Sequence, residues 1–174
     1  MGKKIFLIFV KRDDSELCDF CIINQRKNNK TMKINENAPV KQKNQIVINA
    51  VPEKVWAVLT DINQWGSWNE KITEAQASET QKVGARFDWK VNGASIKSIL
   101  HTVSTHKAFG WSGTTFGGSA IHNWFLTAHQ AGTLVNVEES MEGWLVSLFK
   151  NKMNRDLAKD MQFWLEMLKR ECEK

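Results

Sequence analysis

A histidine and a glutamate on one predicted β-hairpin are the residues of this sequence best suited to chemistry. His122 and Glu139 lie in two strand-like runs, "SAIHNWFLTA" and "TLVNVEESM", which the residues "HQAG" join. An imidazole beside a carboxylate in an apolar pocket can orient a ligand hydroxyl or act as a general acid and base. Two alternatives stay open: the two side chains only satisfy each other, or a register slip of one residue turns both outward.

The register of this hairpin, Ala120–Met141, decides which side chains share a face with the pair. With Ala131–Gly132 as a two-residue turn, His122 and Glu139 become diagonal neighbours on one face. That face is the more apolar of the two, so we expect it to point toward the interior. It consists of His122, Trp124, Leu126, Ala128, Val135, Val137, Glu139 and Met141.

Other patterns for catalysis or metal binding are missing from the sequence. The remaining three histidines are scattered, without HxH or HExxH spacing, and there is no GxSxG, P-loop or GxGxxG motif. Cys18 and Cys21 form a lone CxxC without the second ligand pair that a zinc site needs, and Cys172 stands alone near the end of the chain. We therefore expect no metal, no cofactor and no thiol nucleophile.

Short elements come before the hairpin and must position it. A β-branched run at Asn44–Ala50 predicts a strand, and Pro52 begins a helix that fades near Asp61. A second short helical turn would carry Trp65 and Trp68 on one side, because residues three apart are neighbours on a helix. The alternating run "ARFDWKV" and the dipeptide "NG" then begin a meander of antiparallel strands.

From Gly143 the hydrophobic period changes from two to between three and four. This spacing predicts one amphipathic helix of roughly seven turns, with Phe149 and Trp164 on its buried face. The chain is thus expected to be an α+β protein in which one long helix lies over one curved sheet. The gap between helix and sheet must be filled by side chains or by a ligand. The inner face offers many aromatic and apolar groups: Phe87, Trp89, Trp111, Trp124, Leu126 and Met141.

The N-terminal quarter differs from the rest in charge and composition. Residues 1–44 hold ten Lys and Arg against five Asp and Glu, whereas residues 45–174 hold fourteen of each. No basic stripe interleaved with aromatic residues accompanies this excess, which argues against a nucleic-acid partner. Residues 24–44 are rich in Asn, Lys and Gln, and Met32 suggests that residues 1–31 are an upstream extension of the reading frame. We expect residues 1–40 to be a disordered or weakly structured extension, residues 41–174 to be the domain, and residues 1–38 to be dispensable for stability.

The hydropathy of the sequence indicates where in the cell the protein is expected. No apolar run approaches the roughly 18 residues of a membrane span, and "IFLIFV" is too short for the core of a signal peptide. The sequence therefore predicts a cytoplasmic protein without a membrane span, as a monomer or weak dimer.

Three segments carry a resemblance to a known family. They are "INAVPEKVWAVLTDINQWGSWN", "IHNWFLTAHQAGTLVNVEES" and "EGWLVSLFKNKMNRDLAKDMQFWLEMLK". With them the chain resembles the SRPBCC superfamily, of START-like or helix-grip fold, and most closely its polyketide cyclase/dehydrase-like branch. The resemblance implies a curved seven-stranded antiparallel sheet wrapped around the last helix, two short helices after the first strand, and an elongated apolar pocket. It also implies that the two short helices border the pocket mouth, where Trp65 and Trp68 would close the cavity; the alternative is that both pack as core.

Two classes of function follow, with a weaker third. The chain is either a binding protein for a small apolar or aromatic metabolite or lipid, or a cyclase or dehydratase that uses His122 and Glu139 as an acid/base pair. A chaperone-like or partner-binding module is the third. The expected ligand-contacting residues are Trp65, Trp68, Phe87, Trp89, Trp111, His122, Trp124, Leu126, Glu139, Met141, Leu145, Phe149 and Met153.

Overall fold

A computed structural model describes residues 31–174 of the chain. Seven strands form one antiparallel sheet: β1 (Val40–Ile48), β2 (Ile72–Ala77), β3 (Arg86–Val91), β4 (Ala94–Ser104), β5 (Ala108–Thr115), β6 (Gly118–His129) and β7 (Gly132–Glu142). The helices are α2 (Pro52–Thr60), the 3-10 turn η1 (Ile62–Gln64), α3 (Trp65–Trp68), α4 (Trp144–Leu148) and α5 (Lys150–Cys172).

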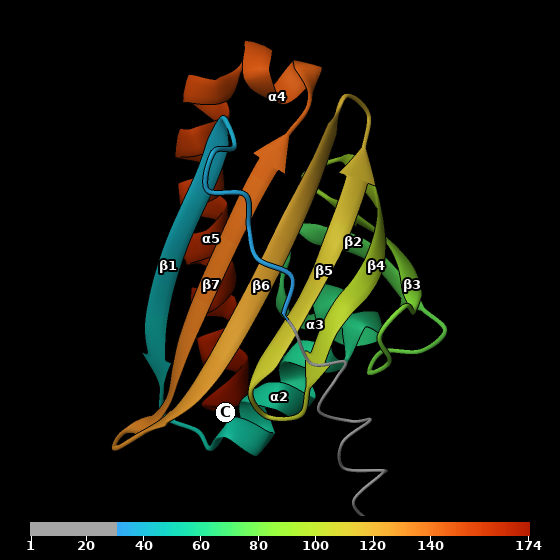
Figure 1. Cartoon of the computed structure of the whole chain (residues 1–174). Helices are drawn as coiled ribbons and strands as arrows, with labels where there is room; N and C mark the ends of the chain where they lie inside the picture. The colour runs from blue at the N-terminus through green and yellow to red at the C-terminus, as the bar shows by residue number, and fades with distance from the viewer. Residues whose placement is uncertain (1–30) are drawn as a thin grey trace, which may run out of the picture. The chain divides into compact units, whose positions relative to one another are not determined.

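The sheet is a meander that the first strand joins at one edge. Its order is β1-β7-β6-β5-β4-β3-β2, so β2 to β7 are neighbours in sequence, and β1 pairs with β7. Figure 1 shows the curved sheet with α5 running along one face, behind β1, β7 and β6, while α2 and α3 lie toward one end. The expected α+β architecture, a curved seven-stranded sheet with a long last helix and short helices after the first strand, is confirmed.

Local sequence explains the β3–β4 connection. Asn92 and Gly93 both have positive φ, 50° and 79°, as a two-residue hairpin turn of type I′ requires.

The first strand of the sheet, β1, begins at Val40 rather than near Asn44, where the sequence predicted it. Its extra residues pair with β7, from Val40 opposite Met141 onward. Pairing with a long partner strand therefore outweighs the low strand propensity of a Lys- and Gln-rich run.

The β6–β7 turn differs from the one predicted. The turn residues are Gln130 and Ala131, because His129 already pairs with Gly132. Gly132 has a φ of 120°, and a Cβ there would lie 2.2 Å from the carbonyl oxygen of Ile48. The glycine is thus needed where the end of β1 passes close by, not for the turn itself. The pairing moves by two residues, which keeps every side chain on its predicted face and brings His122 directly opposite Glu139.

The predicted single helix from Gly143 is interrupted. α4 ends at Leu148, and Phe149, with φ −110° and ψ 22°, separates it from α5. α4 is attached instead to the β5–β6 turn, where the Leu145 backbone NH donates to the Gly117 carbonyl oxygen at 3.2 Å. Phe149 consequently is half exposed, so its predicted place on the buried face of one continuous helix is wrong.

An aromatic cluster forms the centre of the core. Trp65 is fully buried, and its ring centroid lies 5.3–5.6 Å from those of Phe87, Trp89, Trp111 and Trp164. Its indole Nε1 donates to the Leu59 carbonyl oxygen at 2.9 Å. Trp68 is also buried. Both tryptophans of the short helix are therefore core residues, which was the alternative to a place at the cavity mouth.

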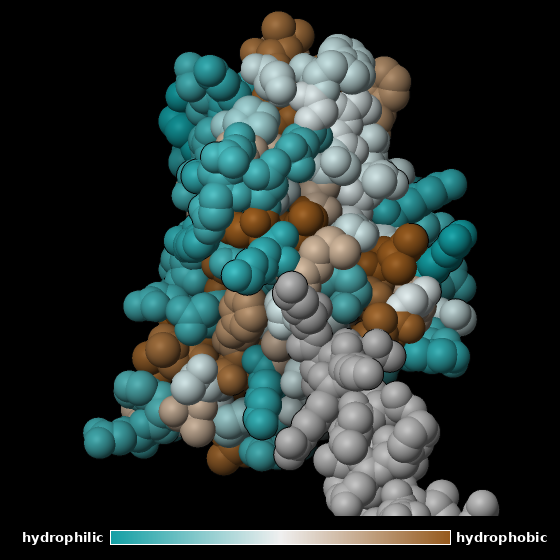
Figure 2. Space-filling view, viewed as in Figure 1, coloured by the Kyte–Doolittle hydropathy of each residue, from teal (hydrophilic) through white to brown (hydrophobic). Residues whose placement is uncertain are grey.

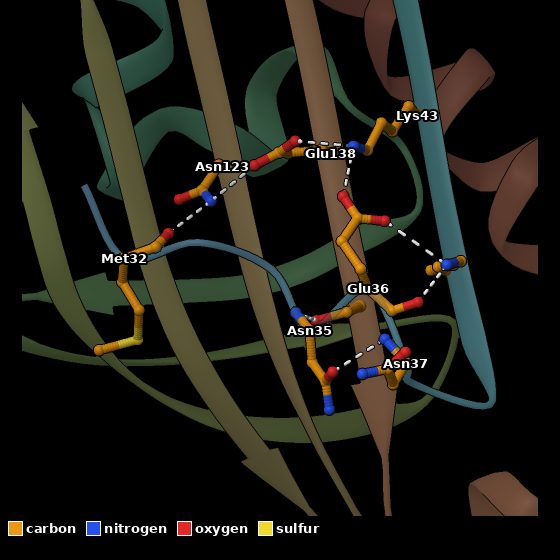
Figure 3. A network of polar contacts seen from close by, with 9 residues as sticks. Met32, Asn35, Glu36, Asn37, Lys43, Asn123 and Glu138 are labelled. Carbon is orange, nitrogen blue, oxygen red and sulfur yellow. Dashed lines mark hydrogen bonds and ion pairs between the residues drawn. The ribbon is translucent and has the colours of Figure 1, made fainter.

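Residues 31–39 lie against the outer face of the sheet. Ile34 is buried, and the Asn35 backbone NH donates to Ser140 Oγ at 3.0 Å. Figure 3 shows the polar part of this contact: Asn123 Nδ2 donates to the carbonyl oxygen of Met32 at 2.8 Å and to Glu138 at 3.1 Å. These contacts attach the segment before β1 to β6 and β7.

Two truncations should separate this segment from the residues before it. A chain that begins at Met32 should keep the melting temperature of the full chain. A chain that begins at Val40 should lose about 1.5–3 kcal/mol of unfolding free energy, because Ile34 no longer covers apolar surface. Denaturant unfolding measures both. If the two truncated chains are equally stable, residues 32–39 do not contribute to the stability of the domain.

Candidate functional site

A cavity of about 890 Å³ lies between the inner face of the sheet and α5. Its walls come from the β3–β4 hairpin, β5, the ends of β6 and β7, and one side of α4 and α5. The side chains that line it include Trp89, Val91, Ile96, Trp111, Phe116, Ala120, His122, Glu139, Met141, Leu145, Val146, Lys152, Met153, Asp156, Leu157, Asp160, Met161 and Trp164. Most are apolar or aromatic, which is typical of a small-molecule site.

His122 and Glu139 meet in this wall. They are paired across β6 and β7, and His122 Nδ1 lies 2.5 Å from Glu139 Oε2. The His122 side chain is 4% exposed and that of Glu139 is 14% exposed. A carboxylate can only accept, so Nδ1 carries the proton of this hydrogen bond, and in the neutral form of the ring Nε2 is then an acceptor. The Trp111 ring stacks on the imidazole at 4.5 Å with an interplanar angle of 9°, which fixes the ring plane.

Two buried nitrogens of the cavity wall have no hydrogen-bond partner among residues 31–174. They are His122 Nε2 and Trp164 Nε1, and the two rings lie 5.7 Å apart. One is an acceptor and the other a donor. An unsatisfied buried polar group costs about 1–3 kcal/mol. Both rings border the cavity, and a hydroxyl group that reached the two nitrogens would satisfy the acceptor and the donor together.

Charged side chains of α5 line the same cavity. Lys152 Nζ contacts Asp156 at 2.5 Å, and this neighbour holds the pKa of the Asp156 carboxyl below its usual value. Asp160 pairs with Lys71 at 2.7 Å and accepts from Asn92 Nδ2 at 3.1 Å. The sequence analysis did not select these residues, because it considered only the apolar face of this helix. The signal was present in the spacing of Lys152, Asp156 and Asp160, which are four residues apart.

The thirteen predicted site residues fall in three places. Seven of them line the cavity: Trp89, Trp111, His122, Glu139, Met141, Leu145 and Met153. Five are core residues outside its lining: Trp65, Trp68, Phe87, Trp124 and Leu126. Phe149 is outside the lining as well and is half exposed. Trp164 and Met161, which sequence reasoning treated as helix core, belong to the wall.

Other reactive groups lie elsewhere. Among residues 31–174 no cluster of three His, Cys, Asp or Glu side chains is arranged to hold a metal ion. Cys172 is buried in the last turn of α5, and burial raises the pKa of its thiol to about 12, so it stays protonated at neutral pH. Cys18 and Cys21 lie outside the described residues. Within the described part of the chain, no helix has the length and hydrophobicity needed to cross a membrane.

The sequence and the fold match known proteins. The family model described as "Polyketide cyclase / dehydrase and lipid transport" matches residues 39–173. A hypothetical protein, jhp0584 from Helicobacter pylori, superimposes with a TM-score of 0.72 at 15% identity over 79% of this chain and 90% of its own. The Zhui aromatase/cyclase from Streptomyces sp. R1128 gives 0.63 at 14% identity, over 76% and 93%. DynU16, a putative protein in the dynemicin biosynthetic locus, gives 0.63 at 17% identity, over 77% of this chain and 47% of its own. No curated protein matches the sequence. At these identities the structural matches support the fold alone.

Proposed function

Because the chain belongs to the polyketide cyclase/dehydrase and lipid transport family, we propose that its cavity binds a small apolar molecule with at least one ring. The observation that carries this proposal is a pair of nitrogens, His122 Nε2 and Trp164 Nε1, in the wall of a mostly apolar cavity of about 890 Å³. Neither has a hydrogen-bond partner among residues 31–174. Side chains leave this space between the sheet and α5 unfilled, and a mostly apolar cavity with a few polar groups is what small-molecule sites have in common.

The two nitrogens, His122 Nε2 and Trp164 Nε1, limit the class of ligand. In the neutral ring, His122 Nε2 accepts a hydrogen bond from a donor, and Trp164 Nε1 donates one to an oxygen. One hydroxyl group can serve both, because its hydrogen donates while its lone pairs accept. The ligand is therefore an apolar ring compound with a hydroxyl group at one end, such as a phenol or an alcohol, while the aromatic walls cover the rest.

A second candidate is a cyclase or dehydratase that uses the same residues. The short contact between His122 Nδ1 and Glu139 Oε2 favours it. His122 Nε2 would take a proton from the bound molecule, and the Glu139 carboxylate would stabilise the resulting imidazolium and hold the ring in place. This candidate needs the same cavity but adds turnover.

Ligand screening tests both candidates. A thermal-shift screen of hydroxylated ring compounds should raise the melting temperature, since a ligand at a hundred times its dissociation constant adds about 2.7 kcal/mol. His122→Ala should weaken any such compound at least tenfold, because it removes the acceptor. Glu139→Gln should weaken it less, because an amide can still hold Nδ1.

The control and the contradicting results follow from the same assay. His129→Ala, an exposed histidine on the same strand, should leave affinity unchanged. The proposal that a ligand binds to His122 Nε2 and Trp164 Nε1 is wrong if no compound shifts the melting temperature. It is also wrong if His122→Ala binds the compound as tightly as the original chain. Product formation that Glu139→Gln abolishes while binding persists would favour the enzyme.

A further inference from the structure

Four large apolar side chains are exposed at the end of the molecule that carries α4. Phe116 is 81% exposed, Trp144 62%, Leu148 67% and Phe149 50%. Figure 1 shows α4 and the β5–β6 turn at the same end, and Figure 2 shows hydrophobic atoms there. We call these four residues the tip patch.

The tip patch is held together by close backbone contacts. The Phe116 and Trp144 rings meet edge to face at 5.8 Å. Behind them, the Leu145 NH binds the Gly117 carbonyl oxygen. Gly143 has a φ of 133°, and a Cβ on it would lie 2.3 Å from that same oxygen. The turn and α4 thus present their aromatic rings as one unit, with an exposed fraction that ordinary surface residues of this size rarely have.

The charged residues within the segment that carries α4 and the start of α5 are basic. Between Gly143 and Arg155 the chain has three basic residues, Lys150, Lys152 and Arg155, and no acidic one. Lys152 pairs with Asp156. Lys150 is exposed and has no ion-pair partner within residues 31–174. The acidic residue next to this run, Glu142, accepts a hydrogen bond from Asn35 Nδ2 at 2.8 Å.

The tip patch also borders the cavity. Phe116 and Leu145, which flank the Gly117 contact, line its wall together with Gly117 and Gly118. The exposed rings and the cavity lining are therefore continuous. A molecule that entered beside the tip patch would pass from one apolar surface to another.

We propose that the tip patch docks on an anionic lipid surface. Tryptophan, phenylalanine and leucine next to lysine are the combination that binds at the boundary of lipid headgroups and acyl chains, where aromatic rings insert and basic groups meet phosphates. In this arrangement Trp144, Phe116 and Leu148 enter the interface and Lys150 contacts the headgroups. The proposal does not depend on the identity of the cavity ligand.

The area of the tip patch argues against a second copy of the chain as its partner. Four side chains exposed to this extent present on the order of 500 Å² of surface. A stable interface between two proteins takes about 800 Å² from each partner. A lipid surface has no such requirement, because a few inserted aromatic side chains and a basic group suffice.

Vesicle flotation tests the proposal with the full chain. Vesicles of phosphatidylcholine with phosphatidylglycerol should carry the protein, and vesicles of phosphatidylcholine alone should carry at least tenfold less. The double variant Phe116→Ser, Trp144→Ser should lose binding at least tenfold, and Lys150→Glu should lose the preference for the anionic lipid. Melting curves of each variant check that the fold is intact.

Matched controls lie at the other end of β5 and just before α2. Lys107→Glu makes the same charge change in the β4–β5 turn, and Val51→Ser removes an exposed apolar side chain before α2. Both should bind vesicles like the original chain. The proposal is overturned if the chain ignores both kinds of vesicle, if the tip variants bind as well as the controls, or if size-exclusion chromatography shows a dimer that Phe116→Ser, Trp144→Ser dissociates.

Discussion

Replacing Trp65 with alanine is expected to lower the unfolding free energy by about 3–5 kcal/mol, the usual cost of removing a fully buried aromatic side chain. Its ring is in contact range of four other aromatic rings, from β3, β5 and α5. The change also leaves the Leu59 carbonyl without its indole donor. A cavity at this junction cannot close easily, because rigid rings surround it on every side that these contacts define.

Thermal and denaturant unfolding measure this effect. For a domain of this size each kcal/mol corresponds to about 2–4 °C, so the midpoint should fall by roughly 6–20 °C. Trp144→Ala is the matched control, because the same residue type is exposed there, and it should cost less than about 0.5 kcal/mol. Equal losses for the two tryptophans would mean that Trp65 is not at the centre of the core.

Filling the cavity should abolish ligand binding without unfolding the protein. Ala120 lies opposite Gly113 on the inner face, and both line the cavity. Ala120→Phe places a ring in the space that the proposed ligand needs, so affinity should fall at least a hundredfold. The ligand-induced stabilisation of about 2.7 kcal/mol, expected at a hundred times the original dissociation constant, should then disappear.

The control for this variant is the same new residue on the opposite face. Ser112 is next to Gly113 in β5 and pairs with Ile121 on the outer side of the sheet. Ser112→Phe should leave the thermal shift unchanged. A ligand that still stabilises Ala120→Phe as before must bind outside this cavity, and the proposed binding site would then be wrong.

Which parts of the structure the sequence could predict depends on how local the signal is. Alternation and the Asn92–Gly93 pair were sufficient for the β3–β4 hairpin, because a two-residue turn is determined by the residues that form it. The face of His122 and Glu139 was also predictable, since a shift of two residues does not change the side to which a side chain points. The pairing itself was not, because Gly132 looked like a turn residue while its backbone in fact accommodates Ile48, which is distant in sequence.

The break before α5 shows the same limit in a helix. Neither Pro nor Gly marks Phe149, so the period of three and four runs through it. The direction of α4 is decided by its contact with the β5–β6 turn, a tertiary contact that hydrophobic spacing does not encode. The aromatic composition likewise predicted an apolar interior, but it could not show which aromatic residues pack in the core and which line the cavity. Trp65 packs in the core while Trp111 lines the cavity, although both belong to one ring cluster.

The place of β1 at one edge of the sheet has a consequence during translation. Its strand partner is β7, and Ile48 pairs with Thr133, 85 positions later. At about 5–20 residues per second, a ribosome needs roughly 4–17 s to make the intervening chain. Through that interval β2 to β6 can pair with neighbours already made, whereas β1 waits with unpaired backbone groups. Of the seven strands described, a nascent chain therefore exposes β1 longest, and β1 is the strand that a chaperone near the exit tunnel would meet.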